Sequence, residues 1–324
     1  MRIVVTGAAG FVAPYFMSAI RNATSDAEIF ACSRSKTVVN AAEDGFFLDI
    51  TDETAVCELI AQVNPTHVMH LAGISAPPEA TADPKAAWAI NLFGTTNLAR
   101  AILARAPKCV LMLAGSGDVY GSSANQHLPL TEDILLNPIS EYAVTKAAAD
   151  LAIGALAGAG LRCIRFRPFN HVGPGQTEKY ALSSFAAQIA RIELGLQPPI
   201  IRVGNLNAER DFLDVRDVAN AYVSGALRSD RIPAGSVLNI ASGIPRRLSD
   251  LLNQLIGLSS ANVSVEQDPT RVRPIEVPKI YGDASKARAM LDWSPRYDFN
   301  QTISDLLTDW RLRIRCTPVE SVLS

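Results

Sequence analysis

The chain has 324 residues, of which 48% are hydrophobic and 19% are charged, and its formal net charge at pH 7 is −2. That length suits one large globular domain or two coupled ones. The near-neutral charge excludes a global basic field, so we expect neither nucleic acid nor a membrane surface as a partner. Five cysteines without a CxxC pair and only four histidines argue against disulfides and against a metal site. The chain contains no run of about 18 apolar residues, so no membrane-spanning helix is predicted. The cytoplasm is the expected compartment.

The first half of the chain alternates short apolar strands with helical segments. Strands that alternate with helices predict an α/β fold with a doubly wound parallel, Rossmann-type sheet. The strands of such a sheet are covered on both faces and need no polar alternation. We expect strands at 2–5, 28–32, 67–71, 109–113 and 162–166, and helices at 11–22, 52–63, 84–106 and 140–158.

After Pro168 the loops lengthen and arginines become denser. We expect helices there at 183–195, 249–257 and 302–313, and one strand at 237–240 that returns to the sheet. The predicted organisation is a dinucleotide-binding domain and a smaller, interleaved C-terminal substrate domain. The first domain would span 1–168, with 214–241 returning to it, and the second would span 169–213 and 242–324.

A glycine loop follows the first predicted strand and opens a helix. Gly7 and Gly10 allow a tight turn and a close approach of the backbone to a pyrophosphate, which the helix N-terminus then binds. The second strand ends in Cys-Ser-Arg-Ser at 32–35, without the carboxylate that would bind a ribose 2′-hydroxyl. Arg34 favours binding of the 2′-phosphate of NADPH. If Arg34 is only a solvated loop charge, NADH remains possible as the cofactor. Asp49 either caps the adenine edge or caps its own loop.

Three residues carry the chemistry of hydride transfer. Tyr142 and Lys146 lie four residues apart on a predicted helix and so share one face. We expect the Lys146 ammonium to bring the pKa of the Tyr142 phenol toward neutrality, which makes it a usable acid and base. Ser116 follows an apolar strand at the carboxyl edge of the sheet, where it can hold a substrate oxygen. The alternative to this catalytic interpretation is that Tyr142 and Lys146 are an ordinary surface pair and that Ser116 is a serine in a turn.

In this order and spacing the segments resemble the extended short-chain dehydrogenase/reductase family over nearly the whole chain. Further motif matches are His-Leu-Ala-Gly at 70–73, Asn-Leu-Phe-Gly-Thr at 91–95, Val-Tyr-Gly at 119–121 and Asn-Pro-Ile-Ser-Glu-Tyr at 137–142. The resemblance implies a catalytic triad of Ser116, Tyr142 and Lys146, with Asn91 supporting its geometry. The cofactor contacts that it implies are Gly7, Gly10, Phe11, Val12, Arg34, Asp49, Ile50, Leu71, Ala72, Gly73, Asn91, Tyr142 and Lys146.

The second half is similar to one branch of that family, which acts on GDP-linked 6-deoxyhexoses and contains 4,6-dehydratases and 4-keto reductases. The segments that carry this similarity are 167–176, 202–217, 268–274, 282–287 and 293–295, and 169–176 is closer to the reductases. Arginine forks suit a diphosphate, so Arg210 and Arg273 are the candidates for it, whereas Arg202 and Arg271 are expected in surface salt bridges. The predicted substrate contacts are Ser75, Ser116, Asp118, Asn170, Arg210 and Arg273.

Position 118 separates the two activities. The 4,6-dehydratases resemble one another in having there a glutamate that removes the C5 proton. Asp118 is a methylene shorter, which weakens such proton transfer. The sequence therefore predicts reduction of the C4 ketone of GDP-4-keto-6-deoxy-D-mannose by NADPH or NADH. The first candidate product is GDP-D-rhamnose, and its C4 epimer would form if the sugar binds flipped. GDP-mannose 4,6-dehydration is the alternative. A non-catalytic NADP-binding sensor is disfavoured because Tyr142 and Lys146 are both present.

The two longest predicted helices leave the oligomeric state open. The segments 84–106 and 140–158 either cover the sheet or pair with the same helices of a second copy, and members of the resembled family often form such dimers. We therefore expect a homodimer.

Overall fold

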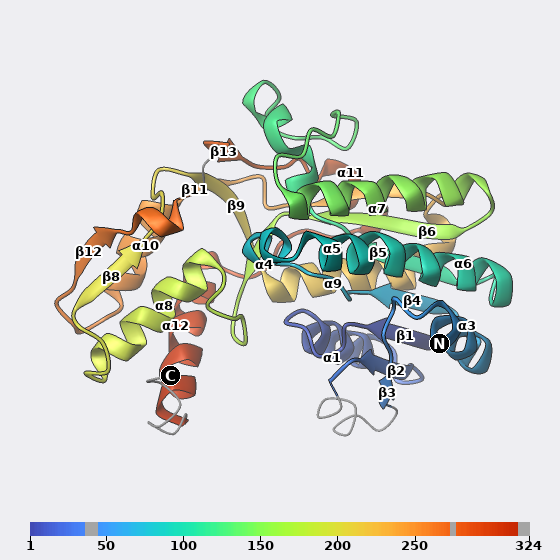
Figure 1. The fold of residues 1–324 in the computed structure, drawn as a ribbon, viewed down its shortest axis with the longest axis horizontal. Coiled ribbons are helices and arrows are strands. Elements are labelled where there is room, and N and C mark those ends of the chain that lie inside the picture. The colour runs from blue at the N-terminus through green and yellow to red at the C-terminus, as the bar shows by residue number, and fades with distance from the viewer. Residues whose placement is uncertain (36–44, 273–276, 317–324) are drawn as a thin grey trace.

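The computed structural model describes residues 1–35, 45–272 and 277–316, and within them seven parallel strands form the central sheet (Figure 1). The order across the sheet is β10-β6-β5-β4-β1-β2-β3, so the winding reverses between β1 and β4. The expected doubly wound parallel sheet is confirmed. The strands are β1 (Arg2–Thr6), β2 (Glu28–Ser33), β3 (Gly45–Phe47), β4 (His67–His70), β5 (Val110–Ala114), β6 (Arg162–Pro168) and β10 (Ser236–Ile240).

Helices cover both faces of this sheet. Ile3 and Val5 of β1 enter the core shared with α1 (Ala13–Ala23) and α9 (Val215–Leu227). Val4, between them, enters the opposite core, which α3 (Glu53–Val63), α6 (Thr95–Arg105) and α7 (Glu141–Gly158) complete. Successive side chains of a strand point to opposite faces, so a strand covered twice must be apolar throughout.

Two features of the helices in the first half differ from the expectation. Helix α1 begins at Ala13 rather than at residue 11, because the glycine loop extends further and Pro14 stands in the first turn of the helix. The expected helix 84–106 is a continuous helical run in three parts, α5 (Pro84–Trp88), the π-helix η1 (Ala89–Gly94) and α6. The Thr95 hydroxyl donates to the Asn91 carbonyl oxygen at 2.7 Å within this run. Asp52 caps α3 as expected, since its carboxylate accepts from the Ala55 amide at 3.0 Å.

A smaller part lies at the left of Figure 1 and contains the three helices expected after Pro168. Its strands were missed by the sequence analysis because most of them carry charged or polar residues instead of a continuous apolar run. Within the described residues it holds a four-stranded sheet of β7 (Asn170–Val172), β9 (Glu209–Asp214), β11 (Pro245–Arg247) and β13 (Lys279–Ile280), and a pair of β8 (Ile200–Val203) and β12 (Ser264–Gln267). A separate core joins α8 (Ala181–Glu193), α10 (Leu248–Gly257) and α12 (Phe299–Cys316). The remaining helical elements are α4 (Pro77–Ala82), α11 (Ser285–Leu291), η2 (Gly117–Asn125), η3 (Ser229–Arg231) and η4 (Pro269–Arg271).

The chain passes back and forth between the two parts. Strand β10 pairs in parallel with β6, and α9 packs beside α1. Val277, Ile280 and Leu291, near the end of the chain, share the core of α1 and α9. The domain boundaries given above remain a prediction.

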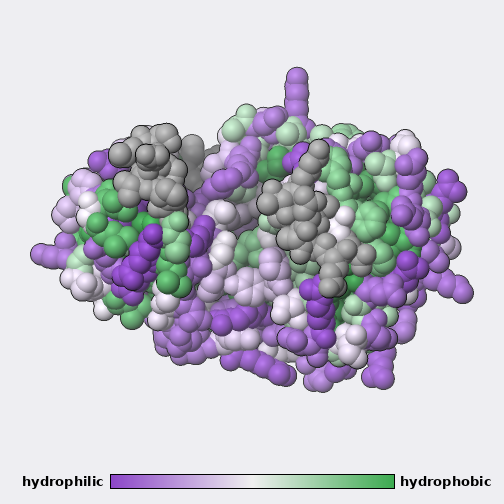
Figure 2. Space-filling model, turned by 90° about the horizontal axis from the view of Figure 1, so that it is seen from below, coloured by the Kyte–Doolittle hydropathy of each residue, from purple (hydrophilic) through white to green (hydrophobic). Residues whose placement is uncertain are grey.

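The surface is mixed in character. On the face shown in Figure 2, hydrophilic side chains predominate around the outline and hydrophobic ones gather in separate patches toward the left and right. Among the residues that the structure describes, no helix is both long and apolar enough to cross a membrane.

Candidate active site

A cavity of about 1420 Å³ opens at the carboxyl ends of the sheet strands and extends to the smaller part. A pocket for one small ligand has roughly 300–1,000 Å³, so this cavity has room for two ligands. Among the described residues of the predicted site, only Asn91 is absent from its lining, and Arg273 lies outside the described residues. The predicted residues that line it are Gly7, Gly10, Phe11, Val12, Arg34, Asp49, Ile50, Leu71, Ala72, Gly73, Ser75, Ser116, Asp118, Tyr142, Lys146, Asn170 and Arg210.

The glycine loop between β1 and α1 forms a close-fitting cradle. Gly7 has a φ of +71°, and a Cβ atom on it would lie 2.6 Å from the Ala72 amide nitrogen. A Cβ on Gly10 would lie 3.0 Å from the Gly7 carbonyl oxygen. Only glycine fits the first position, since both the backbone angle and the neighbouring chain exclude a side chain. The loop faces the cavity at a helix N-terminus, which is the arrangement that binds a pyrophosphate.

The end of β2 holds one cation at the cavity wall. The Arg34 side chain is 61% exposed, and its Nη1 lies 3.7 Å from Asp49 Oδ2. Asp49 accepts from the Thr51 amide at 2.9 Å and from the Thr51 hydroxyl at 2.7 Å. These bonds and Arg34 lower the pKa of the Asp49 carboxyl. Asp49 therefore caps its own loop, while Arg34 keeps donors available for an anionic group such as a 2′-phosphate.

Ser116 and Tyr142 meet at the floor of the cavity. Ser116 follows β5 and caps η2, where its Oγ accepts from the Asp118 amide at 3.1 Å. Tyr142 lies in the first turn of α7, which Ser140 caps by accepting from the Ala143 amide at 3.2 Å. Burial and the Asp118 carboxylate raise the pKa of the Tyr142 phenol above its usual value, and a side-chain hydrogen bond with Ser116 opposes them. Tyr142 is thus a neutral proton donor at physiological pH.

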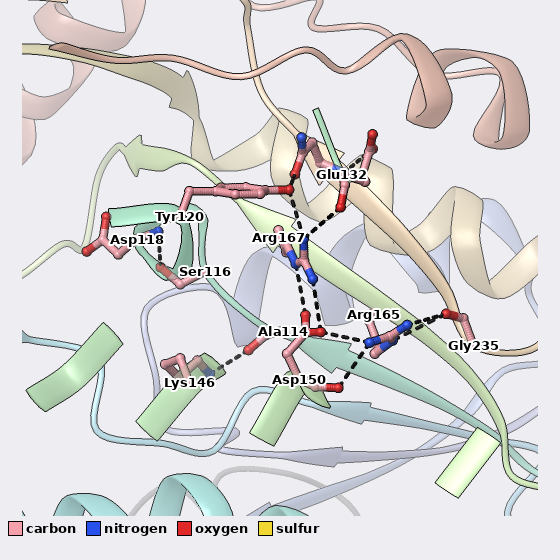
Figure 3. A network of polar contacts seen from close by, with 11 residues as sticks. Ala114, Ser116, Asp118, Tyr120, Glu132, Lys146, Asp150, Arg165, Arg167 and Gly235 are labelled. Atoms are coloured by element: carbon pink, nitrogen blue, oxygen red, sulfur yellow. Dashed lines mark hydrogen bonds and ion pairs between the residues drawn. The ribbon is translucent and has the colours of Figure 1, made fainter. Parts of the chain in front are cut away.

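Lys146 lies one turn after Tyr142 on α7. Its Nζ donates to the Ala114 carbonyl oxygen at 2.6 Å (Figure 3). Burial lowers the pKa of Lys146 to about 8, although the Asp150 carboxylate acts in the opposite direction. The expectation that Lys146 brings the pKa of Tyr142 toward neutrality is wrong for this structure. The Lys146 ammonium is held against Ala114, and burial dominates the ionisation of Tyr142.

Asn91 stands behind the cavity wall rather than in it. Its side chain is nearly fully buried, and Oδ1 accepts from the Ile74 amide at 2.8 Å. Its Nδ2 donates to the Ile74 carbonyl oxygen at 3.1 Å and to Thr145 Oγ1 at 3.0 Å. Asn91 therefore ties the loop after β4 to α7, which carries Tyr142.

One cavity residue, Tyr180, was missed by the sequence analysis. Its hydroxyl lies 2.8 Å from Ser75 Oγ, so the predicted substrate residue Ser75 contacts the smaller part across the cavity. An ion pair between Lys179 and Glu79 lies alongside. Burial raises the pKa of Tyr180, and the Asp118 carboxylate raises it further. No motif or spacing relates Tyr180 to the catalytic segments, so the sequence carried no signal for it.

The smaller part lines the cavity with cations and amides. Arg210 Nη1 donates to the Glu209 carbonyl oxygen at 2.9 Å, and Asn170 Nδ2 donates to the Asp211 carbonyl oxygen at 3.4 Å. Arg271 forms the expected salt bridge, with Nε 3.4 Å from Asp268 Oδ2, yet it also lines the cavity. This wall suits an anionic ligand with several oxygen atoms. Within the described ranges, no group of three or more metal-binding side chains exists.

Comparisons with known proteins agree with this site. The family model described as GDP-mannose 4,6 dehydratase matches residues 4–306. The chain is 33% identical to a GDP-6-deoxy-D-mannose reductase of Pseudomonas aeruginosa, over 97% of this chain and 98% of that protein. It is 28% identical to GDP-mannose 4,6 dehydratase 1 of Arabidopsis thaliana, over 81% of this chain and 72% of that protein.

A solved structure of RMD from Pseudomonas aeruginosa complexed with NADPH superposes with a TM-score of 0.84 at 32% identity, covering 96% of this chain and 99% of that one. The family model spans most of the chain, and the glycine cradle, Ser116, Tyr142 and Lys146 occupy one cavity. The chain therefore belongs to the GDP-mannose 4,6 dehydratase family of the extended short-chain dehydrogenases/reductases.

Proposed function

We propose that the protein reduces the C4 ketone of GDP-4-keto-6-deoxy-D-mannose with NADPH and that the GDP-6-deoxyhexose formed is GDP-D-rhamnose. The observation that carries this proposal is the single cavity that Ser116, Tyr142 and Lys146 line together with the glycine cradle. Reduction of a ketone needs a proton donor at its oxygen, and a phenol with a raised pKa remains one. The similarity to a GDP-6-deoxy-D-mannose reductase supports the same substrate class.

The chain's own residues would divide the work as follows. Ser116 would hold the ketone oxygen by a hydrogen bond, and Tyr142 would donate its hydroxyl proton to that oxygen as charge develops on it. Lys146, cationic below a pKa of about 8, would donate hydrogen bonds from its ammonium to the nicotinamide ribose. NADPH, when bound, supplies the hydride.

The cofactor fits the residues present. Gly7 and Gly10 would hold the pyrophosphate, and Arg34 would bind the 2′-phosphate that distinguishes NADPH from NADH. The neighbour of similar fold that was solved with NADPH supports this choice. NADH would bind the same cradle without the contact to Arg34. The GDP diphosphate would lie against the opposite wall, where Arg210 and Arg271 supply guanidinium groups.

Asp118 favours reduction over dehydration. A 4,6-dehydratase of this family needs a base at C5, and the shorter aspartate holds its carboxylate further back than a glutamate would. In this site burial raises the pKa values of Tyr142 and Tyr180, and the Asp118 carboxylate acts in the same direction, which favours the protonated phenols.

The test is a reduced-nicotinamide absorbance assay with two arms. Purified protein with NADPH and GDP-4-keto-6-deoxy-D-mannose should consume NADPH in a substrate-dependent manner, and Tyr142→Phe should remove this activity while NADPH still binds. The parallel arm contains GDP-mannose and NADP. A 4-keto product in that arm, without net cofactor consumption and with silence in the first arm, would make the protein a dehydratase. Sugar analysis of the product establishes the configuration at C4.

Our proposals on organisation concern domains, compartment and oligomeric state. We propose the domain division 1–168 with 214–241, against 169–213 and 242–324, and a cytoplasmic location. We also propose a homodimer formed through the helical run of α5, η1 and α6 and through α7, since Phe93 of η1 and Leu151 of α7 expose 58% and 59% of their surface. Light scattering should give twice the chain mass, and Leu151→Glu should give the monomer mass.

A further inference from the structure

A buried ionic cluster lies beneath the catalytic floor (Figure 3). Asp150, on α7 one turn beyond Lys146, is fully buried. Its Oδ2 accepts from Arg167 Nε at 3.0 Å and its Oδ1 from Arg167 Nη2 at 3.1 Å, a two-pronged pair. Arg165 Nη1 donates to the same Oδ1 at 2.8 Å. Buried ion pairs add little net stability because desolvation offsets their attraction, so this cluster calls for a role beyond stability.

Arg167 reaches from this cluster to the segment that carries Ser116. Its Nη1 donates to the Tyr120 hydroxyl at 2.9 Å and to the Glu132 carbonyl oxygen at 3.3 Å. The guanidinium carbon also lies 5.1 Å from the centre of the Tyr120 ring. Tyr120 belongs to η2, one turn after Ser116 and close to Asp118, and is fully buried. The Tyr120 hydroxyl in turn donates to Asn239 Oδ1 at 2.8 Å, which fixes its direction.

The two catalytic segments are thus connected through one side chain. Ser116 is carried by the start of η2 and Tyr142 by the start of α7, two elements separated by a long loop. Arg167, at the end of β6, holds Tyr120 of the first element and Asp150 of the second. We propose, on the basis of the proposed function, that Arg167 is a positioning residue that sets the spacing between Ser116 and Tyr142.

Chemistry at this site is sensitive to that spacing. The substrate oxygen must accept hydrogen bonds from Ser116 and Tyr142 at the same time, which requires both hydroxyls within hydrogen-bond reach of one point. A misplacement of about 1 Å can cost roughly 100-fold in rate. A guanidinium can hold Asp150 with two nitrogens and Tyr120 with a third, whereas a lysine ammonium is a compact point charge without this planar fork.

The neighbouring Arg165 provides a matched control. It pairs with the same Asp150, but its other donors, Nε and Nη2, bind the Gly235 carbonyl oxygen at 3.2 and 2.8 Å, away from η2. An Arg165→Lys change therefore disturbs the same buried cluster without cutting the connection to Tyr120. Tyr120→Phe leaves the ion pairs of Asp150 in place and keeps the ring, but it removes the hydroxyl to which Arg167 donates.

The experiment compares Arg167→Lys, Tyr120→Phe and Arg165→Lys in the full-length protein. We expect the first two to lower kcat about 10- to 100-fold while the KM for NADPH stays within about twofold, since the cradle is untouched. The double variant Arg167→Lys/Tyr120→Phe should be no slower than the slower single variant, because both cut one connection. Arg165→Lys should keep the wild-type kcat even if its melting temperature falls.

A second measurement does not depend on turnover. Hydrogen–deuterium exchange of a peptide covering 117–125 should quicken in Arg167→Lys and Tyr120→Phe and stay at the wild-type rate in Arg165→Lys. Wild-type kcat and exchange in Tyr120→Phe would overturn the proposal, as would an equal loss of kcat in Arg165→Lys. If the wild-type protein reduces no keto sugar, the proposed function fails, and the exchange pattern still decides whether Arg167 positions η2. If Arg167→Lys does not fold, Tyr120→Phe decides.

Discussion

Raising the pH from 7 to 9 should remove most of the catalytic efficiency through a single group, Lys146. An exposed lysine would remain almost fully charged over this range, since its ordinary pKa is about 10.4. Burial lowers the pKa of Lys146 to about 8, and its contact with Ala114 keeps it inside the wall rather than in solvent. With that pKa, about one tenth of the molecules keep the ammonium at pH 9. The cationic form is the active one, so activity is present below pH 8 and is lost as the pH rises through 8.

The assay is the initial rate of NADPH oxidation at subsaturating keto sugar, from pH 6.5 to 10. Under this condition kcat/KM reports the ionisation of the free enzyme. We expect kcat/KM to be nearly flat below about pH 7, to reach half its maximum near pH 8 and to fall about tenfold for each pH unit above about 9. Circular dichroism at pH 9 and 10 should show that the protein remains folded in this range.

Lys146→Arg is the control for this assignment. A guanidinium does not lose its proton in this range, so the variant should be slower at neutral pH yet have no descending limb near pH 8. A wild-type kcat/KM that stays constant to pH 10 would refute the reasoning. An identical limb in Lys146→Arg would assign the titration to another group.

Three further predictions follow from individual contacts. Arg34→Ala should raise the KM for NADPH about tenfold and leave that for NADH unchanged, because one charge-assisted contact is lost; equal effects on both cofactors would exclude a 2′-phosphate contact. Tyr180→Phe should raise the KM for the keto sugar several-fold without changing NADPH affinity by fluorescence titration, since it removes the hydroxyl bound to Ser75; an unchanged KM would place Tyr180 outside the substrate site. Burial lowers the pKa of His70 to about 3. Below about pH 6.5 the unfolded chain therefore binds a proton at this histidine that the folded protein does not bind, and the free energy of unfolding falls as the pH drops from 6.5 toward 3. Between pH 7 and 5 the wild-type melting temperature should therefore fall about 3 °C more than that of His70→Gln, and equal falls would contradict this.

Much of the cofactor half was predictable because its signals are local. A strand covered on both faces needs a run of apolar residues. The loop between β1 and α1 needs a residue that tolerates a positive φ, which is a glycine. Both patterns can be seen in a short stretch of sequence. Tyr142 and Lys146 share a helix face at a spacing of four residues, which needs no tertiary information. Most strands of the smaller part carry charged or polar residues instead of a continuous apolar run, and β7, β8, β9, β11, β12 and β13 were therefore missed.

The parallel sheet, the glycine loop and the candidate residues Ser116, Tyr142 and Lys146 could be predicted from the sequence, because each follows from a pattern within a short segment. Only the tertiary structure decided that Asn91 stands behind the cavity wall, that Tyr180 meets Ser75 and that Arg167 connects Tyr120 to Asp150. It also reversed the expected direction of the Tyr142 pKa. Burial and contacts between distant segments set these properties, and neither is encoded in the spacing of neighbouring residues.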